Sequence, residues 1–238
     1  MRLDKFVAHN TSYSRSQVRG LLKAKRIRVN GQCALAPSAA LKSDDEVTLD
    51  DTLLQARSDV YLMLHKPTGY VCANTDAEHP TVFDLPGFRA RYSNADIARL
   101  QIAGRLDLDT TGLVLITSDG QWNHRITSPR HKCRKAYYVE CADPIATEAK
   151  SAFAEGVVLH GEKRPTLPAE LELLSVNTAN LYIEQGIYHQ VKRMFASTGN
   201  KVLRLHRFQI GPLALDNDLL PGEIRALTSD EIRLLNNA

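Results

Sequence analysis

The 238-residue sequence has few cysteines, no long apolar run and none of the glycine-rich motifs of nucleotide-binding proteins. Its four cysteines lie far apart and form no C-x-x-C pair, which argues against zinc ribbons and thiol redox centres. No Walker loop or G-x-G-x-x-G turn follows a strand-like segment, which argues against nucleotide hydrolysis and dinucleotide redox chemistry. No apolar run approaches the roughly 18 residues of a membrane span, and the first residues are charged instead of forming a signal-peptide core. We therefore expect a cytoplasmic protein with reduced thiols, no membrane contact and no cofactor.

The charges that are present are unevenly distributed along the chain. Residues 1–31 contain eight lysines and arginines and one acidic residue, Asp4, whereas the remaining residues carry 22 basic and 26 acidic side chains. Such a concentration of positive charge is self-repelling unless it meets a polyanion, and nucleic-acid phosphates are the usual one. We therefore expect residues 1–31 to bind nucleic acid. The rest of the chain, in a sequence that is 43% hydrophobic, is long enough to bury a core of its own.

The apolar spacing within the basic segment predicts two short helices and a hairpin. Apolar residues recur at helical spacing over residues 3–7 and again over 18–22, where Ser14 is suited to the N-cap position. The second helix carries basic side chains four residues apart, on the face opposite the apolar one: Arg15, Arg19 and Lys23. The segment RIRVNG then alternates as a strand does and ends in Asn30-Gly31, which is typical of a hairpin turn.

From residue 61 onward the sequence alternates between short strands and turns. Strand-like runs are VYLMLHK, LVLIT, KAYYVEC and ANLYIEQG, the second of them ended by a turn at Ser118-Asp119-Gly120. Helical stretches are expected near residues 143–155 and 189–199. This mixture predicts an α+β domain around a mixed, mostly antiparallel sheet, with the functional cleft across that sheet.

The string AGRLDLDTTGLVLITSDG, residues 103–120, places two carboxylates and an arginine directly before an apolar run. A carboxylate in that position, with cations nearby, can stay ionised and be aimed at an electron-poor carbon or a neighbouring proton. A glycosidase needs two carboxyl groups about 5 to 9.5 Å apart, one of them protonated. The two aspartates fit this poorly, because DTTG resembles a turn whose aspartate bonds its own backbone. We therefore assign chemistry to Asp107 and loop geometry to Asp109.

A single essential carboxylate suits a reaction that breaks an N-glycosidic bond without needing water. Uracil is a tolerable leaving group because its charge spreads over two carbonyls. If the base stays bound after it is released, it can reattach through another atom, and that reaction makes pseudouridine.

Two further stretches carry basic residues and no acidic ones, and they predict a cationic cleft if both flank residues 103–120. Residues 121–139 contain Arg125, Arg130, Lys132, Arg134 and Lys135, and residues 185–215 contain Lys192, Arg193, Lys201, Arg204 and Arg207. Aromatic residues of types that stack on unpaired bases are interleaved, although each alone is more often a core residue: Trp122, Tyr137, Tyr138, Tyr188 and Phe195. The first of these stretches also contains three potential metal ligands, His124, His131 and Cys133. A fourth ligand has no obvious source, so we expect no metal site.

Several of these motifs resemble known families. RLDKFVAHN, SRSQVRGLLKAKRIRVNG and SDDEVTLD resemble the S4 RNA-binding domain, with Lys25 where that domain usually has glycine. KPTGY, AGRLDLDTTGLVLITSDG, RKAYYV and YHQVKRMF resemble the motifs of pseudouridine synthases, and GQWNHRITSPRHKCRKAYYV is similar to their small-subunit ribosomal branch. The resemblance implies an S4-like helix-helix-hairpin domain with its linker over residues 1–58 and a catalytic domain over residues 59–238. Residues 51–59 are expected to form the linker.

The resemblance also implies roles for individual residues. Asp107 matches the catalytic aspartate, which attacks C1′ of the target uridine or removes its 2′-proton. Tyr137 matches the tyrosine beside the uracil ring, and Lys192 the basic residue that pairs with the aspartate. Arg105 matches the arginine that helps to hold the extruded nucleotide, and Lys66 a supporting residue. The other expected contacts with RNA are Tyr70, Arg193, Arg15, Arg19 and Lys23.

The expected activity is the isomerisation of a uridine in small-subunit (16S) ribosomal RNA, either free or in its precursor particle, by a monomer that needs no cofactor or metal. Ile187 departs from the family pattern, because Arg or Lys commonly stands there, and an RNA contact at that position is open. Other functions also remain open: a large-subunit rRNA pseudouridine synthase, a nucleosidase-like hydrolase that releases uracil, and a non-catalytic RNA-binding ribosome assembly factor.

Overall fold

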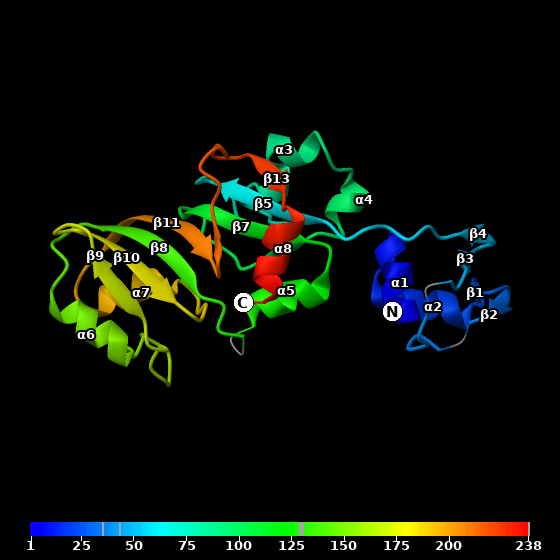
Figure 1. Cartoon of the computed structure of the whole chain (residues 1–238), viewed down its shortest axis with the longest axis horizontal. Helices are drawn as coiled ribbons and strands as arrows, with labels where there is room; N and C mark the ends of the chain where they lie inside the picture. The colour runs from blue at the N-terminus through cyan, green and yellow to red at the C-terminus, as the bar shows by residue number, and fades with distance from the viewer. Residues whose placement is uncertain (35, 43, 129–130, 238) are drawn as a thin grey trace. The chain divides into compact units, whose positions relative to one another are not determined.

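A computed structural model of the chain describes residues 1–34, 36–42, 44–128 and 131–237 (Figure 1). Residue contacts divide it into two compact units. The first unit consists of Met1–Asp59 with Asn94–Arg99, and the second of Val60–Ser93 with the residues from Leu100 onward. Each unit has its own hydrophobic core. No helix in the described ranges is long and apolar enough to cross a membrane.

The first unit combines two helices with a four-stranded antiparallel sheet in the order β2-β1-β3-β4. Its elements are α1 (Leu3–Asn10), α2 (Arg15–Lys23), β1 (Ile27–Val29), β2 (Gln32–Cys33), β3 (Val47–Leu49) and β4 (Thr52–Leu53). The predicted N-cap is confirmed: Ser14 forms a capping box with Gln17. The predicted hairpin turn is also confirmed, with both Asn30 and Gly31 at positive φ. Strand β4 lies within the segment expected to be linker, so that expectation was partly wrong.

A buried carboxylate ties the two helices of this unit together. The Asp4 side chain is 1% exposed and accepts hydrogen bonds from Arg2, at 3.0 and 3.1 Å, and from Arg15, at 2.8 Å. Burial acts to raise the pKa of Asp4, but the hydrogen bonds and charges of the two arginines outweigh it and lower that pKa to about 2. Arg15 therefore has a structural partner within its own unit.

The second unit is built around a nine-stranded sheet with the path β13-β5-β7-β11-β8-β10-β9, to which β6 and β12 add at β7 and β11. The strands are β5 (Tyr61–Lys66), β6 (Gln101–Ala103), β7 (Thr111–Thr117), β8 (Lys135–Cys141), β9 (Glu170–Leu173), β10 (Thr178–Ile183), β11 (Val202–Ile210), β12 (Leu213–Ala214) and β13 (Ile224–Ala226). Among the described strands, β7 and β11 pair in parallel and the other neighbours are antiparallel. The α+β class with a mixed, mostly antiparallel sheet is therefore confirmed.

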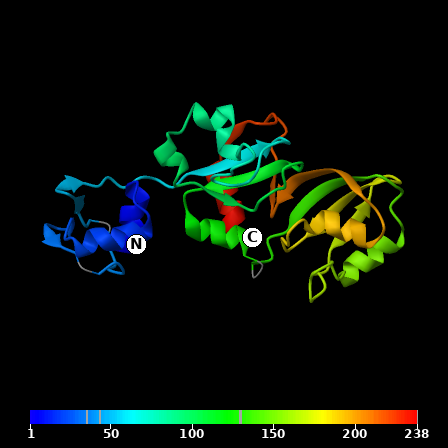
Figure 2. The same cartoon turned by 180° about the vertical axis from the view of Figure 1, so that it is seen from behind.

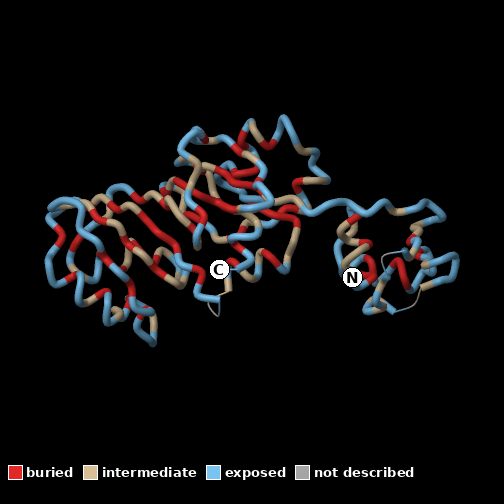
Figure 3. The backbone as a smooth tube through the Cα atoms, viewed as in Figure 1, coloured by how far each residue is buried: buried red, intermediate tan, exposed pale blue. Residues whose placement is uncertain are grey.

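Helices cover the two ends of this sheet (Figure 2). At the β5–β7 end lie α5 (Gly120–Thr127) and α8 (Ser229–Asn236), and at the β8–β10 end α6 (Glu148–Glu155) and α7 (Gln190–Ser197). Three shorter elements, η1 (Val82–Asp84), α3 (Pro86–Arg89) and α4 (Asn94–Ile97), lie between β5 and β6 in the chain. Buried residues follow the central strands (Figure 3). The helices expected near 143–155 and 189–199 are confirmed by α6 and α7. The predicted turn at 118–120 leads directly into α5, where Asp119 is the N-cap.

Candidate active site

Residues 104–110 form a loop between β6 and β7, and a buried lysine holds its backbone from beneath. Lys66 Nζ donates to the carbonyl oxygens of Asp107 at 2.9 Å, Thr110 at 2.8 Å, Leu108 at 3.3 Å and Pro67 at 2.9 Å. The lysine has no exposed surface, and burial lowers the pKa of its ammonium. The structure thus places Lys66 under the loop instead of at a surface that RNA can reach, so it acts as a positioning residue. Its place at the start of KPTG was visible in the sequence, but its burial was not.

The loop ends where β7 meets β11, and this contact requires a glycine. Gly112 has φ +109°, and a Cβ there would lie 2.2 Å from the backbone oxygen of Arg207. The parallel pairing of Gly112 with Arg207 brings the Arg207 guanidinium beneath the loop. That guanidinium donates to the backbone oxygens of Leu113 at 2.8 Å, Gly104 at 2.8 Å and Arg105 at 3.4 Å. Arg207 therefore supports the loop from the sheet side.

Asp107 lies half-buried at the tip of this loop, between two basic side chains from the start of α7. Its side chain is 27% exposed. One carboxylate oxygen is 3.5 Å from His189 Nε2 and the other is 3.6 Å from Lys192 Nζ. These groups come from the YHQVKRMF segment, so α7 brings together the aspartate and the lysine that the sequence predicted as a pair.

Lys192 makes its shorter contact with the other aspartate. Its Nζ donates to Asp109 at 2.5 Å, and the Asp109 side chain is 69% exposed. Partial burial acts to raise the pKa of Asp109, but the hydrogen bond and the charge of Lys192 lower it below its usual range. Lys192 therefore bridges both carboxylates. The Asp109 carboxylate also accepts a hydrogen bond from its own backbone, which is the contact that the sequence suggested.

The residue at the start of α7 has an unusual backbone conformation. His189 is the N-cap residue of this helix and lies in the left-handed region, at φ 50° and ψ 34°. Its ring stacks on Tyr188, with 3.8 Å between centroids, and Tyr188 is 69% exposed. A non-glycine residue in this region is uncommon and is found at functional sites. Neither the conformation of His189 nor its contact with Asp107 was predicted from the sequence.

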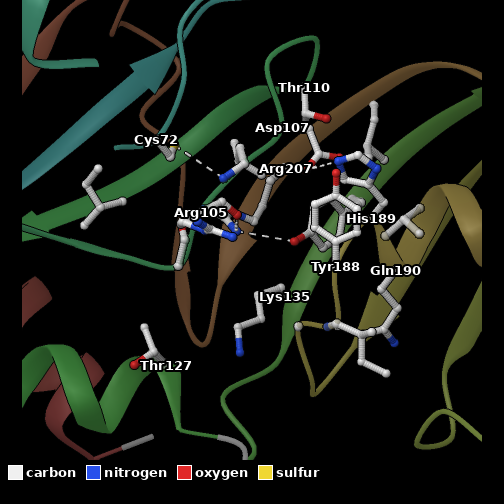
Figure 4. Close-up of a pocket in the computed structure, with 18 of the residues that line it drawn as sticks. Cys72, Arg105, Asp107, Thr110, Thr127, Lys135, Tyr188, His189, Gln190 and Arg207 are labelled. Atoms are coloured by element: carbon white, nitrogen blue, oxygen red, sulfur yellow. Dashed lines mark hydrogen bonds and ion pairs between the residues drawn. The ribbon is translucent and has the colours of Figure 1, made fainter. Parts of the chain in front are cut away.

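The loop and the start of α7 border a cavity of about 840 Å³ (Figure 4). Asp107, Arg105, Tyr137, Lys135 and Arg207 are among its lining residues. Tyr137 is 8% exposed, and its hydroxyl accepts a hydrogen bond from Arg207 at 3.3 Å. Arg105 is exposed, and its side chain projects from the loop. The cavity thus places an aspartate, an aromatic ring and several cations around one space that is large enough for a nucleotide.

The predicted cationic cleft is correct for some of its residues. Lys135 and Arg207 line the cavity. Others make ion pairs away from it: Arg134 with Glu170, Arg204 with Glu140, and Arg193 with Glu162. Arg130 lies outside the described residues. Of the predicted aromatic residues, Tyr137 and Tyr188 line the cavity, Tyr138 is half-buried outside the lining, and Trp122 and Phe195 are core residues.

The remaining predicted RNA contacts lie outside this cavity. Tyr70 is half-buried beside the KPTG turn and is not among the lining residues. Arg15, Arg19 and Lys23 are exposed on α2 of the first unit. Ile187, at the position that departs from the family pattern, does line the cavity and is half-buried.

Comparisons with known proteins find matches for both parts of the chain. Residues 60–197 match the family model described as RNA pseudouridylate synthase, and residues 1–47 match the S4 domain model. "Ribosomal small subunit pseudouridine synthase A" of Haemophilus influenzae is 47% identical over 236 residues, which cover 99% of both chains. The protein of the same name from Escherichia coli (strain K12) is 47% identical over 234 residues, 98% of both chains. A solved structure described as "Crystal structure of pseudouridylate synthase" aligns with a TM-score of 0.71 at 46% identity over 99% of both chains.

Proposed function

Because the chain belongs to the RNA pseudouridylate synthase family, we propose that it converts a specific uridine of small-subunit ribosomal RNA to pseudouridine, with Asp107 as the essential carboxylate. The observation that carries the proposal is the position of Asp107, which lies between His189 and Lys192 and lines the same cavity as Tyr137. The relatives that it resembles over nearly their whole length bear names that specify the small ribosomal subunit.

The arrangement suits an isomerisation that consumes no co-reactant. The C1′–N1 bond of the uridine breaks, and its electron pair leaves with the uracil. Asp107 assists either by attacking C1′ or by removing the 2′-proton. The detached base stays in the cavity beside Tyr137, turns, and forms a new bond from C5 to C1′. As that bond forms, the Asp107–C1′ ester bond breaks, or on the other route Asp107 returns its proton to C2′. The proton on C5 is then lost and N1 regains one, so atoms and charge balance.

Neighbouring residues hold the aspartate in place for this step. The Lys192 ammonium and the His189 ring lie beside the two carboxylate oxygens, which keeps the carboxylate aimed at the cavity. Lys66 and Arg207 fix the backbone of the loop that carries Asp107. Such fixed positioning matters because a small displacement of a reacting group lowers the rate strongly.

RNA binding requires contacts beyond the cavity. The target base must leave its stack, which costs a few kcal/mol, and contacts with phosphates and bases must offset that cost. Arg105 is exposed at the cavity and is suited to holding the extruded nucleotide. Arg19 and Lys23 of the S4 domain are suited to phosphate contacts, while Arg193 and Tyr70 serve as secondary candidates.

The proposed organisation is a monomer of two domains, residues 1–58 and 59–238, that works in the cytoplasm, where small ribosomal subunits are assembled. The residues assigned to the chemical step all come from one chain, so the proposal needs no second subunit.

Incubation of the purified protein with unmodified 16S rRNA and with its precursor particle tests the function, followed by carbodiimide mapping of pseudouridines. One new pseudouridine is expected with the wild type and none with Asp107→Asn. Release of free uracil would instead identify a hydrolase, and unchanged uridine in both substrates would identify a non-catalytic binding protein. A new pseudouridine only in large-subunit RNA would reassign the substrate.

A further inference from the structure

Lys135 is a buried lysine on the cavity wall whose ammonium has no hydrogen-bond or ion-pair partner within the described ranges. The residue is 8% exposed and lines the cavity. Its side chain points into the cavity, on the side where Thr127 lies (Figure 4). Burial lowers the pKa of Lys135 and the charge of Arg207 lowers it further, while Cys133 and Glu184 act in the opposite direction without outweighing them. An unpaired buried cation is costly, which suggests that a ligand completes its contacts.

The other buried or half-buried cations around the loop already have partners. The Lys66 ammonium donates to four backbone oxygens. Lys192 bridges the two aspartates, and Arg207 donates to three backbone oxygens and the Tyr137 hydroxyl. Lys135 is therefore the buried cation of this site, within the described residues, whose charge is available to a substrate.

Lys135 lies on the same strand as Tyr137, the aromatic residue of the cavity. Lys135 and Tyr137 are two residues apart in β8, so their side chains lie on the same face of the sheet, with Cα atoms about 7 Å apart. A base that lies beside Tyr137, with its sugar at Asp107, can therefore extend its carbonyl edge toward Lys135.

We propose that Lys135 binds the carbonyl edge of the target uracil and stabilises the negative charge that the ring acquires when it is detached from C1′. This inference rests on the proposed function and deepens it. When the C1′–N1 bond breaks, its electron pair leaves on uracil and the charge spreads onto the two carbonyl oxygens. A fixed, largely buried ammonium stabilises such a charge more than it stabilises the neutral base, and that difference accelerates the step.

A backbone phosphate is the other anion that could meet this lysine, and the burial of Lys135 argues against it. Phosphates of a bound RNA strand stay near solvent, as does the exposed Arg105 at the same cavity. Lys135 is 8% exposed and lies next to the apolar Ile183 in the cavity lining. The two ligands also predict different kinetics, because a phosphate contact supports binding, whereas a contact with the departing base supports the chemical step.

The test uses Lys135→Met, which keeps the length of the side chain and removes its charge, with Lys163→Met as the matched control because Lys163 is exposed and outside the cavity lining. RNA dissociation constants and single-turnover rates at saturating RNA are measured with uridine and with 5-fluorouridine at the target position. Fluorine at C5 withdraws electrons, so the detached ring needs less stabilisation. For the fluorinated RNA, the measured step is cleavage of the N-glycosidic bond.

For uridine, Lys135→Met is expected to lower the single-turnover rate by about 10²-fold, the scale for removing one donor to a developing negative charge, with RNA affinity unchanged within about twofold. The loss should be several-fold smaller with 5-fluorouridine, and Lys135→Arg should retain part of the rate. Lys163→Met should behave as wild type.

Three results would overturn the inference alone. Weaker RNA binding with a normal rate would identify a phosphate contact. Equal losses with both bases, or a loss accompanied by unfolding in Lys135→Arg as well, would identify a structural role. A wild type that modifies neither RNA would overturn the proposed function itself, which distinguishes that failure from failure of the inference alone.

Discussion

Asp107 and Asp109 are chemically identical side chains, and their surroundings predict effects of very different size for the same substitution. Asp107→Asn removes the carboxylate at the cavity and is expected to lower the single-turnover rate by at least about 10⁴-fold, the scale for a group that acts directly. Asp109→Asn removes an exposed partner of Lys192 and should lower the rate by less than about tenfold, since exposed pairs contribute at most ~1 kcal/mol. RNA binding, measured by filter retention, should survive both changes. An inactive Asp109→Asn beside an active Asp107→Asn would reverse the assignment.

A second prediction at the residue scale concerns the effect of Lys192 on the reaction rate. Lys192 lies between the carboxylates of Asp107 and Asp109 and contacts both. In Lys192→Met, Asp107 loses its ammonium partner and Asp109 adds unbalanced negative charge nearby. The single-turnover rate at saturating RNA is expected to fall by about 10 to 100-fold, and Lys192→Arg should keep more activity because it keeps the charge with a different geometry. If Lys192→Met binds RNA more weakly but reacts at the normal rate, Lys192 is a phosphate ligand instead.

At the scale of elements, the junction of β7 and β11 leaves no room for a side chain at Gly112. Gly112→Ala would place a Cβ 2.2 Å from the Arg207 backbone oxygen at φ +109°, so the strands must separate. We expect a loss of more than about 2 kcal/mol of stability and most of the activity, because Arg207 supports both the loop and Tyr137. Gly161→Ala is the matched control, with a φ of +81° and no atom within 4 Å of its Cβ, and should change thermal unfolding much less. Equal effects of the two would mean that the close contact is unimportant.

The contact of Asp4 in α1 with Arg15 in α2 predicts that the stability of the first unit depends on pH. Asp4 has a pKa of about 2 in the folded chain, below its usual 3.8, so its stabilisation of roughly 2 kcal/mol is present above about pH 4 and is lost as the pH falls toward 2. This loss of stability is measured by hydrogen exchange of peptides from α1 and α2, after correction for the intrinsic pH dependence of exchange. Asp4→Asn should reduce protection at pH 7 and approach the wild type near pH 2. A difference that persists at pH 2 would show that packing, and not charge, is responsible.

The local elements were the part that the sequence predicted well. Helical spacing with Ser14 as N-cap specified α2, and short strand-like runs bounded by turns specified β5, β7, β8 and β10, because these patterns depend on near neighbours. The parallel pairing of β7 with β11 joins residues about 95 positions apart, and no local pattern encodes it. For the same reason Asp107 and Lys192 were predicted from motifs, whereas the role of Arg207 in holding the loop required the fold.

At the scale of the whole molecule, the basic first unit and the catalytic unit predict a division between binding and chemistry. The structure changes how the division is best tested, because Arg15 is bonded to the buried Asp4 and its removal would disturb the unit itself. Arg19 and Lys23 are exposed on the same helix and can be changed without that effect.

The double substitution Arg19→Gln with Lys23→Gln should therefore weaken RNA binding and leave the single-turnover rate at saturating RNA unchanged. If each side chain contacts one phosphate, the logarithmic dependence of affinity on salt should lose about 1.4 to 1.8 from its slope, since each contact contributes about 0.7 to 0.9. Lys150→Gln with Arg233→Gln removes the same charge from exposed positions of the second unit and serves as the control. A slope that changes equally in both pairs would reflect net charge alone. An unaltered slope in the first pair would mean that this face of α2 remains in solvent when RNA is bound, and that the affinity of the chain for RNA comes from other residues.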